Sequence, residues 1–155
     1  MFGIEFDREI FALACANMLI HKDGKTNLEQ LDTRTDEACE WIKDKKITKV
    51  LMNPPYERKY GCLKIVDNVL KSVPIGTKCA FILPDKKLEK DYIDKKYGNK
   101  LLKNNTLTTI IKLPENLFFG VGVTTSIFVF EGSNGLIICR VPYIESSPSL
   151  IAPIQ

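Results

Sequence analysis

Hydrophobic positions recur along the chain at two alternating spacings, which predict short strands separated by longer helices. Compact runs rich in β-branched and aromatic residues indicate strands. Apolar residues three and four positions apart indicate helices. The strands expected are Phe2–Glu5, Asn27–Leu31, Ile47–Met52, Cys79–Leu83, Thr108–Leu113, Thr125–Glu131 and a last hairpin arm, Leu136–Val141. The helices expected are Arg8–Ile20, Asp36–Lys45, a segment from Leu63 to Val73, and Lys87–Lys103.

This alternation predicts an α/β domain whose mostly parallel sheet carries helices on both faces. Ligands of such sheets bind at the carboxyl ends of the strands. We therefore expect the functional residues in the loops that follow Glu5, Leu31 and Met52. Residues 1–145 are interpreted as one domain, and the Ser- and Pro-containing residues 146–155 as a tail or linker.

Composition excludes few classes of protein. The 22 Lys and Arg residues exceed the 19 Asp and Glu residues by three, which permits an anionic partner without requiring one. Five cysteines without a C-x-x-C pair, beside a single histidine, provide no zinc ligand set. They are interpreted as reduced thiols of a cytoplasmic protein. No apolar run approaches the roughly 20 residues of a membrane helix, so no membrane partner is expected.

The most informative segment is Asn53-Pro54-Pro55-Tyr56, which follows an apolar strand. The two prolines stiffen the backbone and carry no N–H groups. The Asn53 amide oxygen and the Pro54 carbonyl oxygen can then accept hydrogen bonds from one amino group. Such acceptors would stabilise a tetrahedral amine nitrogen in a transition state without a metal or a catalytic histidine. Tyr56 adds a ring suited to stacking on a base taken out of the double helix.

Landmarks in a fixed order resemble the amino-directed adenine-N6 DNA methyltransferases, most closely the modification subunits of type I restriction-modification systems. Besides the turn, they are Gly3-Ile4-Glu5-Phe6-Asp7 with Leu13-Ala14 and Asn17-Met18, Ala80-Phe81-Ile82-Leu83-Pro84, and Ile110-Ile111-Lys112-Leu113-Pro114-Glu115-Asn116-Leu117-Phe118. The resemblance covers nearly the whole chain. It implies a Rossmann-like S-adenosylmethionine-dependent methyltransferase sheet, and methyl transfer from this cofactor to a flipped-out adenine in DNA.

The resemblance also implies roles for residues at the cofactor. Glu5 would bind the ribose hydroxyls of S-adenosylmethionine, and Phe6 would pack on its adenine ring. Asp32 would accept a hydrogen bond from the adenine amino group of the cofactor. The alternative for both carboxylates is a structural role at a strand end, starting a loop or capping the next helix.

A second set of residues would contact the target adenine. Its members are Asn53, Pro54, Pro55, Tyr56, Phe118 and Phe119. The asparagine and the first proline would hold the N6 amine, the tyrosine would stack on the base, and one phenylalanine would pack on its edge or other face. The alternative for the turn is a rigid connection without chemistry, because Asn and Pro are common turn residues.

The chain also departs from the family. Such enzymes carry, before the position of Gly3, a strand and a loop of the form D/N-P-x-x-G-x-G, which this chain lacks. A partial catalytic domain, incomplete at its N-terminal side and without its central strand, is expected. The expected partners are double-stranded DNA, a specificity subunit and further restriction-modification subunits. A second copy of the chain would be one way to cover the open sheet edges. The alternatives are a non-catalytic module that binds DNA or the specificity subunit, and a methyltransferase acting on RNA or protein amines.

Overall fold

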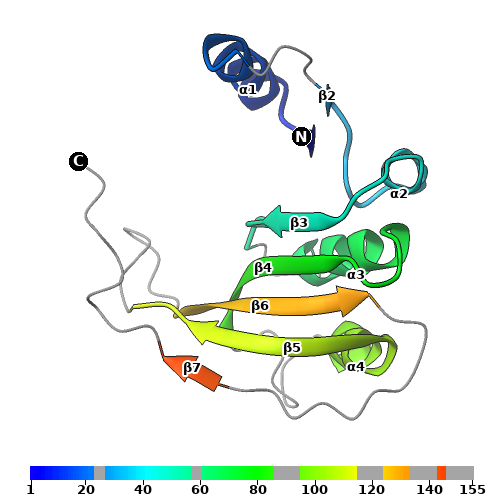
Figure 1. Ribbon diagram of the computed structural model, residues 1–155, viewed down its shortest axis with the longest axis vertical. Coiled ribbons are helices and arrows are strands. Elements are labelled where there is room, and N and C mark those ends of the chain that lie inside the picture. Colours follow the sequence, from blue (N-terminus) through cyan, green and yellow to red (C-terminus); the bar gives the residue numbers. More distant parts are fainter. Residues whose placement is uncertain (23–26, 57–60, 86–94, 115–123, 133–142, 146–155) are drawn as a thin grey trace.

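The computed structural model describes residues 1–22, 27–56, 61–85, 95–114, 124–132 and 143–145, and of 95–99 and 143–145 the backbone only. Strands and helices follow one another along the chain as the hydrophobic pattern predicts (Figure 1). The strands are β1 (Phe2–Ile4), β2 (Asn27–Glu29), β3 (Lys49–Met52), β4 (Lys78–Pro84), β5 (Asn105–Lys112), β6 (Thr125–Gly132) and β7 (Tyr143–Glu145). The helices are α1 (Arg8–Ile20), α2 (Asp36–Lys43), α3 (Gly61–Ser72) and α4 (Lys95–Asn104). The expected hairpin arm Leu136–Val141, residues 146–155 and the first part of the expected helix Lys87–Lys103 lie outside the described residues.

The larger sheet is mostly parallel, as expected, because four of its five described strands run in one direction and β6 alone runs the other way. Its strand order is β3-β4-β6-β5-β7, with β3 parallel to β4 and β5 parallel to β7. Strand β6 runs antiparallel to both of its neighbours. Lys112 at the end of β5 pairs with Ser126 near the start of β6. The chain therefore reverses at this end of the sheet and returns between β4 and β5, instead of crossing over to enter parallel.

The remaining strands, β1 and β2, form a separate parallel pair that lies apart from the larger sheet in Figure 1. Phe2 pairs with Asn27 and Ile4 with Glu29. Within the described residues, β1 has β2 as its only neighbour and β3 has only β4. The described strands are therefore divided between two sheets.

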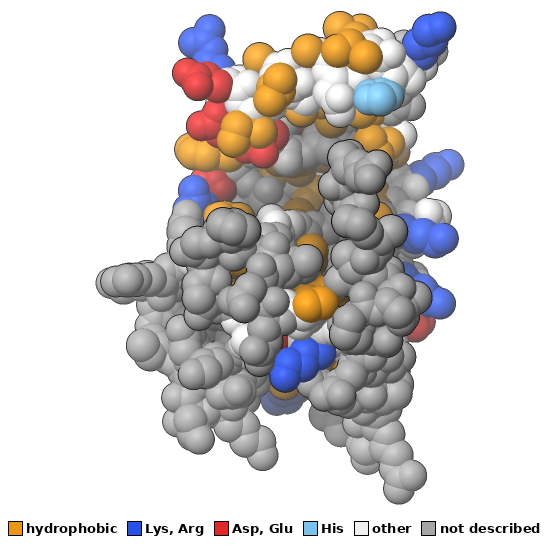
Figure 2. Space-filling view, turned by 90° about the vertical axis from the view of Figure 1, so that its left-hand side faces the viewer, with side chains coloured by type: hydrophobic (Ala, Val, Ile, Leu, Met, Phe, Trp, Pro, Cys, Tyr) orange, Lys and Arg blue, Asp and Glu red, His pale blue; other side chains and the backbone are white. Residues whose placement is uncertain are grey.

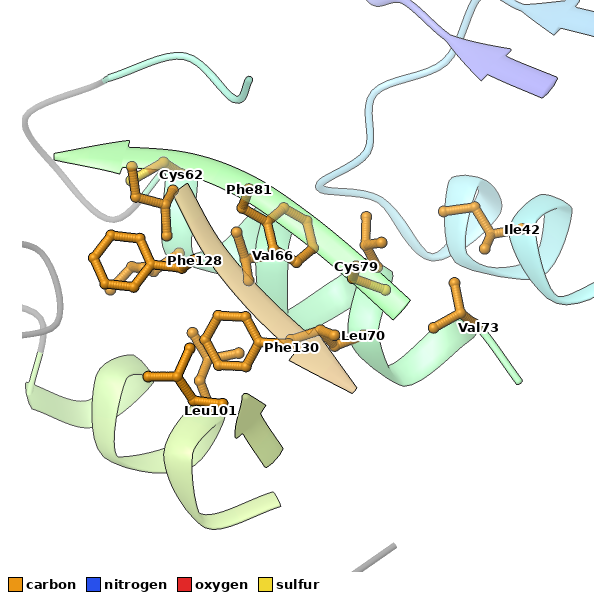
Figure 3. Packing of buried hydrophobic residues seen from close by; sticks show 14 residues of the cluster. Ile42, Cys62, Val66, Leu70, Val73, Cys79, Phe81, Leu101, Phe128 and Phe130 are labelled. Carbon is orange, nitrogen blue, oxygen red and sulfur yellow. The ribbon is translucent and has the colours of Figure 1, made fainter. Parts of the chain in front are cut away.

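The core lies between the larger sheet and the helices α3 and α4 (Figure 3). Cys79, Phe81 and Leu83 alternate along β4 and are fully buried, because a strand directs every second side chain to one face. Phe81 contacts Phe130 of β6 edge to face, with ring centroids 6.1 Å apart. The helix residues of this cluster include Cys62, Leu63, Val66, Val69, Leu70 and Leu101.

Helix α1 is apolar yet lies at the surface. It begins after Asp7, whose Oδ1 atom accepts hydrogen bonds from the N–H groups of Glu9 and Ile10 at 2.9 and 3.0 Å. None of its residues is buried, and Leu13 and Ile20 are 70% and 75% exposed. Figure 2 shows hydrophobic side chains over this part of the surface, at the top of the molecule. Among the described residues, no helix combines the length and the hydropathy that crossing a membrane requires.

Candidate active site

The Asn-Pro-Pro-Tyr turn follows the carboxyl end of β3, the position at which parallel strands present ligand-binding residues. Met52, the last residue of β3, is half-buried and packs against the core, and Pro54 is buried. Asn53 is exposed, so its side-chain amide faces solvent beside a proline that is fixed in the protein. The turn thus combines a buried proline with an exposed asparagine.

Tyr56 is held close to Asn53 within the turn. Its hydroxyl donates a hydrogen bond to the Asn53 Oδ1 atom at 2.9 Å. The tyrosine is half-buried, and burial raises the pKa of its hydroxyl above the ordinary value, with a smaller contribution from Cys62. The hydroxyl is therefore protonated near neutral pH and acts as a donor.

Another carboxylate lies at the end of the neighbouring strand. Asp85 directly follows β4, and its Oδ1 atom accepts a hydrogen bond from the Ser126 hydroxyl at 2.7 Å. The Asp85 N–H donates to the Thr124 carbonyl oxygen at 3.0 Å. Because β3 and β4 are parallel, Asn53 and Asp85 lie at the same edge of the sheet, where β5 also ends. This edge therefore gathers the Asn-Pro-Pro-Tyr turn and the start of the loop that follows β5.

The residues expected at the cofactor follow the other pair of strands. Glu5 comes directly after β1, and its N–H donates to the Glu29 carbonyl oxygen of β2 at 3.2 Å. Its Oε1 atom accepts a hydrogen bond from the Asp7 N–H at 2.8 Å, which shapes the turn into α1. The Phe6 side chain is 63% exposed. A carboxylate and an accessible aromatic ring thus stand side by side in sequence at this strand end.

Asp32 lies in the loop after β2 and is paired with Arg34. The Arg34 Nε atom lies 2.9 Å from Oδ1 and 3.1 Å from Oδ2 of the aspartate, and the Arg34 N–H also donates to Oδ1 at 2.9 Å. These hydrogen bonds hold the pKa of Asp32 below its ordinary value, so the carboxylate is ionised at neutral pH. The Arg34 guanidinium carbon also lies over the Phe6 ring, 5.7 Å from its centroid. The loops after β1 and β2 therefore meet.

Hydrogen bonds to backbone atoms hold the loop that contains Asp32 in place. The Thr35 N–H and hydroxyl both donate to the Asp32 carbonyl oxygen, at 2.9 and 2.8 Å. The Thr35 hydroxyl oxygen in turn accepts from the Ala38 N–H at the start of α2. Asn68 of α3 donates to the Thr33 carbonyl oxygen at 3.0 Å. Helix α3 thus connects the Asp32 loop to the part of the chain that carries the Asn-Pro-Pro-Tyr turn.

The structure brings together two groups of the expected site residues. Asp32 and Phe6 share the Arg34 side chain, and Asn53 and Tyr56 share a hydrogen bond. Phe118 and Phe119 lie outside the described residues. Sequence reasoning did not single out Arg34 or Asp85, although both follow strand ends, where side chains at the ligand edge are expected. Within the described residues, no group of three or more His, Cys, Asp or Glu side chains could hold a metal ion.

Comparison with known proteins identifies the family. The family model for N-6 DNA methylases matches residues 1–76 and 63–140. Over 139 residues the chain is 32% identical to the type II restriction enzyme and methyltransferase RM.BcgI of Heyndrickxia coagulans. That alignment covers 84% of this chain and 22% of the relative. The chain belongs to the N-6 DNA methylase family, which confirms the resemblance seen in the sequence.

Solved structures confirm the fold class. A type I restriction-modification system methyltransferase subunit from Streptococcus thermophilus superposes with a TM-score of 0.69 at 19% identity, over 93% of this chain and 36% of that one. A protein from Listeria monocytogenes, described as a class I S-adenosylmethionine-dependent methyltransferase, gives a TM-score of 0.71 at 18% identity, over 95% of this chain and 50% of that one. The fold is that of S-adenosylmethionine-dependent methyltransferases, and the chain spans half or less of the length of these relatives.

Proposed function

We propose that this chain is the catalytic part of an adenine-specific DNA methyltransferase of a restriction-modification system. The observation that carries the proposal is the exposed Asn53 amide beside the buried Pro54, at the end of β3 in a chain of the N-6 DNA methylase family. The proposed partners are double-stranded DNA and, by analogy with type I systems, a specificity subunit.

The residues present fit S-adenosylmethionine as the cofactor. Asp32 is ionised and can accept a hydrogen bond from an adenine amino group, and the Phe6 ring is accessible for packing on a purine. Glu5, at the end of the adjacent strand, would hold the ribose hydroxyls. When bound, this cofactor supplies a methyl group on a positively charged sulfur.

The proposed action of the turn concerns the target amine. The Asn53 Oδ1 atom and the Pro54 carbonyl oxygen would accept hydrogen bonds from the two amine hydrogens, leaving the nitrogen lone pair directed at the methyl group. These dipoles are fixed before reaction, which is the main source of electrostatic stabilisation in a transition state. The Tyr56 ring would stack on the extruded base, and Phe118 or Phe119 would pack on its edge or other face.

The test is transfer of a tritiated methyl group from S-adenosylmethionine to DNA, RNA or protein. Incorporation into DNA at adenine N6 is expected, with a fall of about a hundredfold or more in the rate for Asn53→Ala, as for loss of one transition-state hydrogen-bond donor or acceptor. Glu37→Gln, at an exposed position of α2 outside the landmarks, is the control and should retain the rate. A rate kept by Asn53→Ala contradicts the mechanism, and labelling of RNA or protein in place of DNA contradicts the substrate.

A non-catalytic binding module is the second candidate. The division of the strands into two separate sheets favours it, because cofactor and substrate residues then stand on different sheets. DNA binding without any methyl transfer by the unaltered chain would support this candidate against the first.

A further inference from the structure

The loop after β2 contains a residue whose contacts point to a role in recognising the cofactor. Arg34 contacts both groups that are proposed to meet the adenine ring, the Asp32 carboxylate and the Phe6 ring. Its side chain is 33% exposed and that of Asp32 is 23% exposed, so the pair is partly shielded from water. A surface ion pair would contact only the acid. The Arg34 guanidinium also contacts the Phe6 ring on another loop, so it links the two loops.

We propose that Arg34 is a positioning residue of the cofactor site, which holds Asp32 and Phe6 in the arrangement that recognises an adenine ring. This inference rests on the proposed function. Arg34 acts through its two neighbours and is not assigned a contact with the cofactor itself.

The distance between Arg34 and Phe6 limits where an adenine could pack. The guanidinium carbon is 5.7 Å from the Phe6 centroid. A flat base inserted between the two would need about 7 Å, two contacts of roughly 3.5 Å each. An adenine that packs on Phe6 would therefore use the opposite face of the ring, while Arg34 contacts the other face through a cation–π interaction.

The carboxylate retains acceptor capacity in this arrangement. An ionised carboxylate has about four lone-pair positions on its two oxygens. The Arg34 Nε–H donates to both oxygens and its backbone N–H donates to Oδ1, so these contacts hold the aspartate ionised and use three of the four positions. An amino group at position 6 of a purine would donate to Asp32, whereas a carbonyl oxygen at that position would face a like-charged acceptor. Arg34 thereby contributes to discrimination between the two.

The experiment is calorimetric titration with S-adenosylhomocysteine and with its 6-oxo analogue, S-inosylhomocysteine. The unaltered chain should prefer the amino ligand by about tenfold or more, the value of one hydrogen bond to a charged group. Arg34→Ala should lose about tenfold in affinity for the amino ligand and most of the preference. Arg34→Lys should also lose most of the preference, because lysine lacks the Nε–H group that contacts both oxygens of the carboxylate. If Arg34→Ala does not fold, the ratio of the two affinities in Arg34→Lys tests whether Arg34 supports the preference for the amino ligand.

The control is Lys43→Ala, which removes an exposed ion pair of α2 with Glu40 at 2.7 Å and should change neither affinity. If Arg34 had a merely structural role, its substitution would weaken the binding of both ligands equally and keep the ratio of their affinities. That result would overturn the inference while the proposed function stands. Failure of the unaltered chain to bind either ligand would instead contradict the proposed cofactor, and the inference with it.

Discussion

The Tyr56 hydroxyl donates to the Asn53 Oδ1 atom at 2.9 Å, so the acceptor proposed for the target amine is already engaged by a side chain of the same turn. An amine that enters would compete with the hydroxyl for this oxygen or share it, because an amide oxygen has two lone pairs. Tyr56→Phe keeps the ring and removes the competing donor. We expect its KM for DNA to fall by about two- to tenfold, the equivalent of one neutral hydrogen bond.

The matched variant for this prediction is Tyr56→Ala, which removes the ring as well. Loss of base stacking, about 1–3 kcal/mol, should raise KM instead. Steady-state methylation kinetics with a DNA duplex distinguish the two. A rise in KM for Tyr56→Phe would show that the hydroxyl helps to bind the base and does not compete with it.

The pairing of Asp32 with Arg34 predicts a pH dependence. Because the pKa of this aspartate is lowered in the folded protein, its contribution to stability is complete above the unfolded-state pKa and is lost as pH falls through the folded-state value. NMR titration of the carboxyl carbon should show the Asp32 pKa rising toward its ordinary value in Arg34→Ala. An unchanged pKa would mean that the hydrogen bonds to Arg34 do not persist in solution.

Cys79 should be unreactive in the folded protein. Burial raises the pKa of its thiol to about 12, so the nucleophilic thiolate is almost absent at pH 8. Iodoacetamide followed by mass spectrometry at pH 8 should label Cys79 only after unfolding. Cys15, half-buried on α1, provides the comparison and should react under native conditions. Equal rates for the two would contradict the buried position of Cys79.

Asp67 is a buried acid, with a side chain 5% exposed, and it forms ion pairs with Lys71 and Lys100. Removing both lysines leaves an unpaired buried charge, so Lys71→Ala with Lys100→Ala should destabilise the protein by about 3–5 kcal/mol. Asp67→Ala should cost less, because the lysine side chains are 46% and 43% exposed and can be hydrated. Urea unfolding followed by circular dichroism measures both. Equal losses would show that Asp67 does not depend on these partners.

Two leucines should differ sharply in their importance for stability. Leu63 of α3 is fully buried in the core, and Leu51 of β3 is 87% exposed. Leu63→Ala should lower the free energy of unfolding by about 2–5 kcal/mol through lost burial and a cavity. Leu51→Ala should stay within about 0.5 kcal/mol of the unaltered chain. A loss at Leu51 comparable to that at Leu63 would show that β3 is covered in solution.

Local patterns predicted most of the fold, because they depend on residues close in sequence. The expected bounds of α1, Arg8–Ile20, agree with the structure, where an apolar run follows the capping Asp7. Strand β5 begins earlier than expected, at Asn105, because pairing with Gly132 includes this asparagine although its strand propensity is low. The antiparallel course of β6 was also not predicted, since strand order depends on contacts distant in sequence.

In the site too, residues close in sequence could be predicted, whereas contacts between distant residues could not. The Asn53 turn is a local signal, since its prolines and its preceding strand are contiguous, and the structure places it at the end of β3. Arg34 gives no such signal. Its contact with Phe6 exists only because β1 and β2 are neighbours, which brings together loops that are far apart along the chain.

The absence of buried side chains in the first part of the chain has a consequence for local opening. Among the described residues, none before Ala38 is buried, whereas α3 and β4 supply most of the core. Regions with few buried contacts open at low free energy, independently of global unfolding. Glu5 and Phe6 therefore stand on a part of the chain that opens readily, and the Asn53 turn on one that opens only with the core. A ligand that binds the closed form stabilises the weaker part by mass action, so cofactor binding would be coupled to closure of β1, α1 and β2.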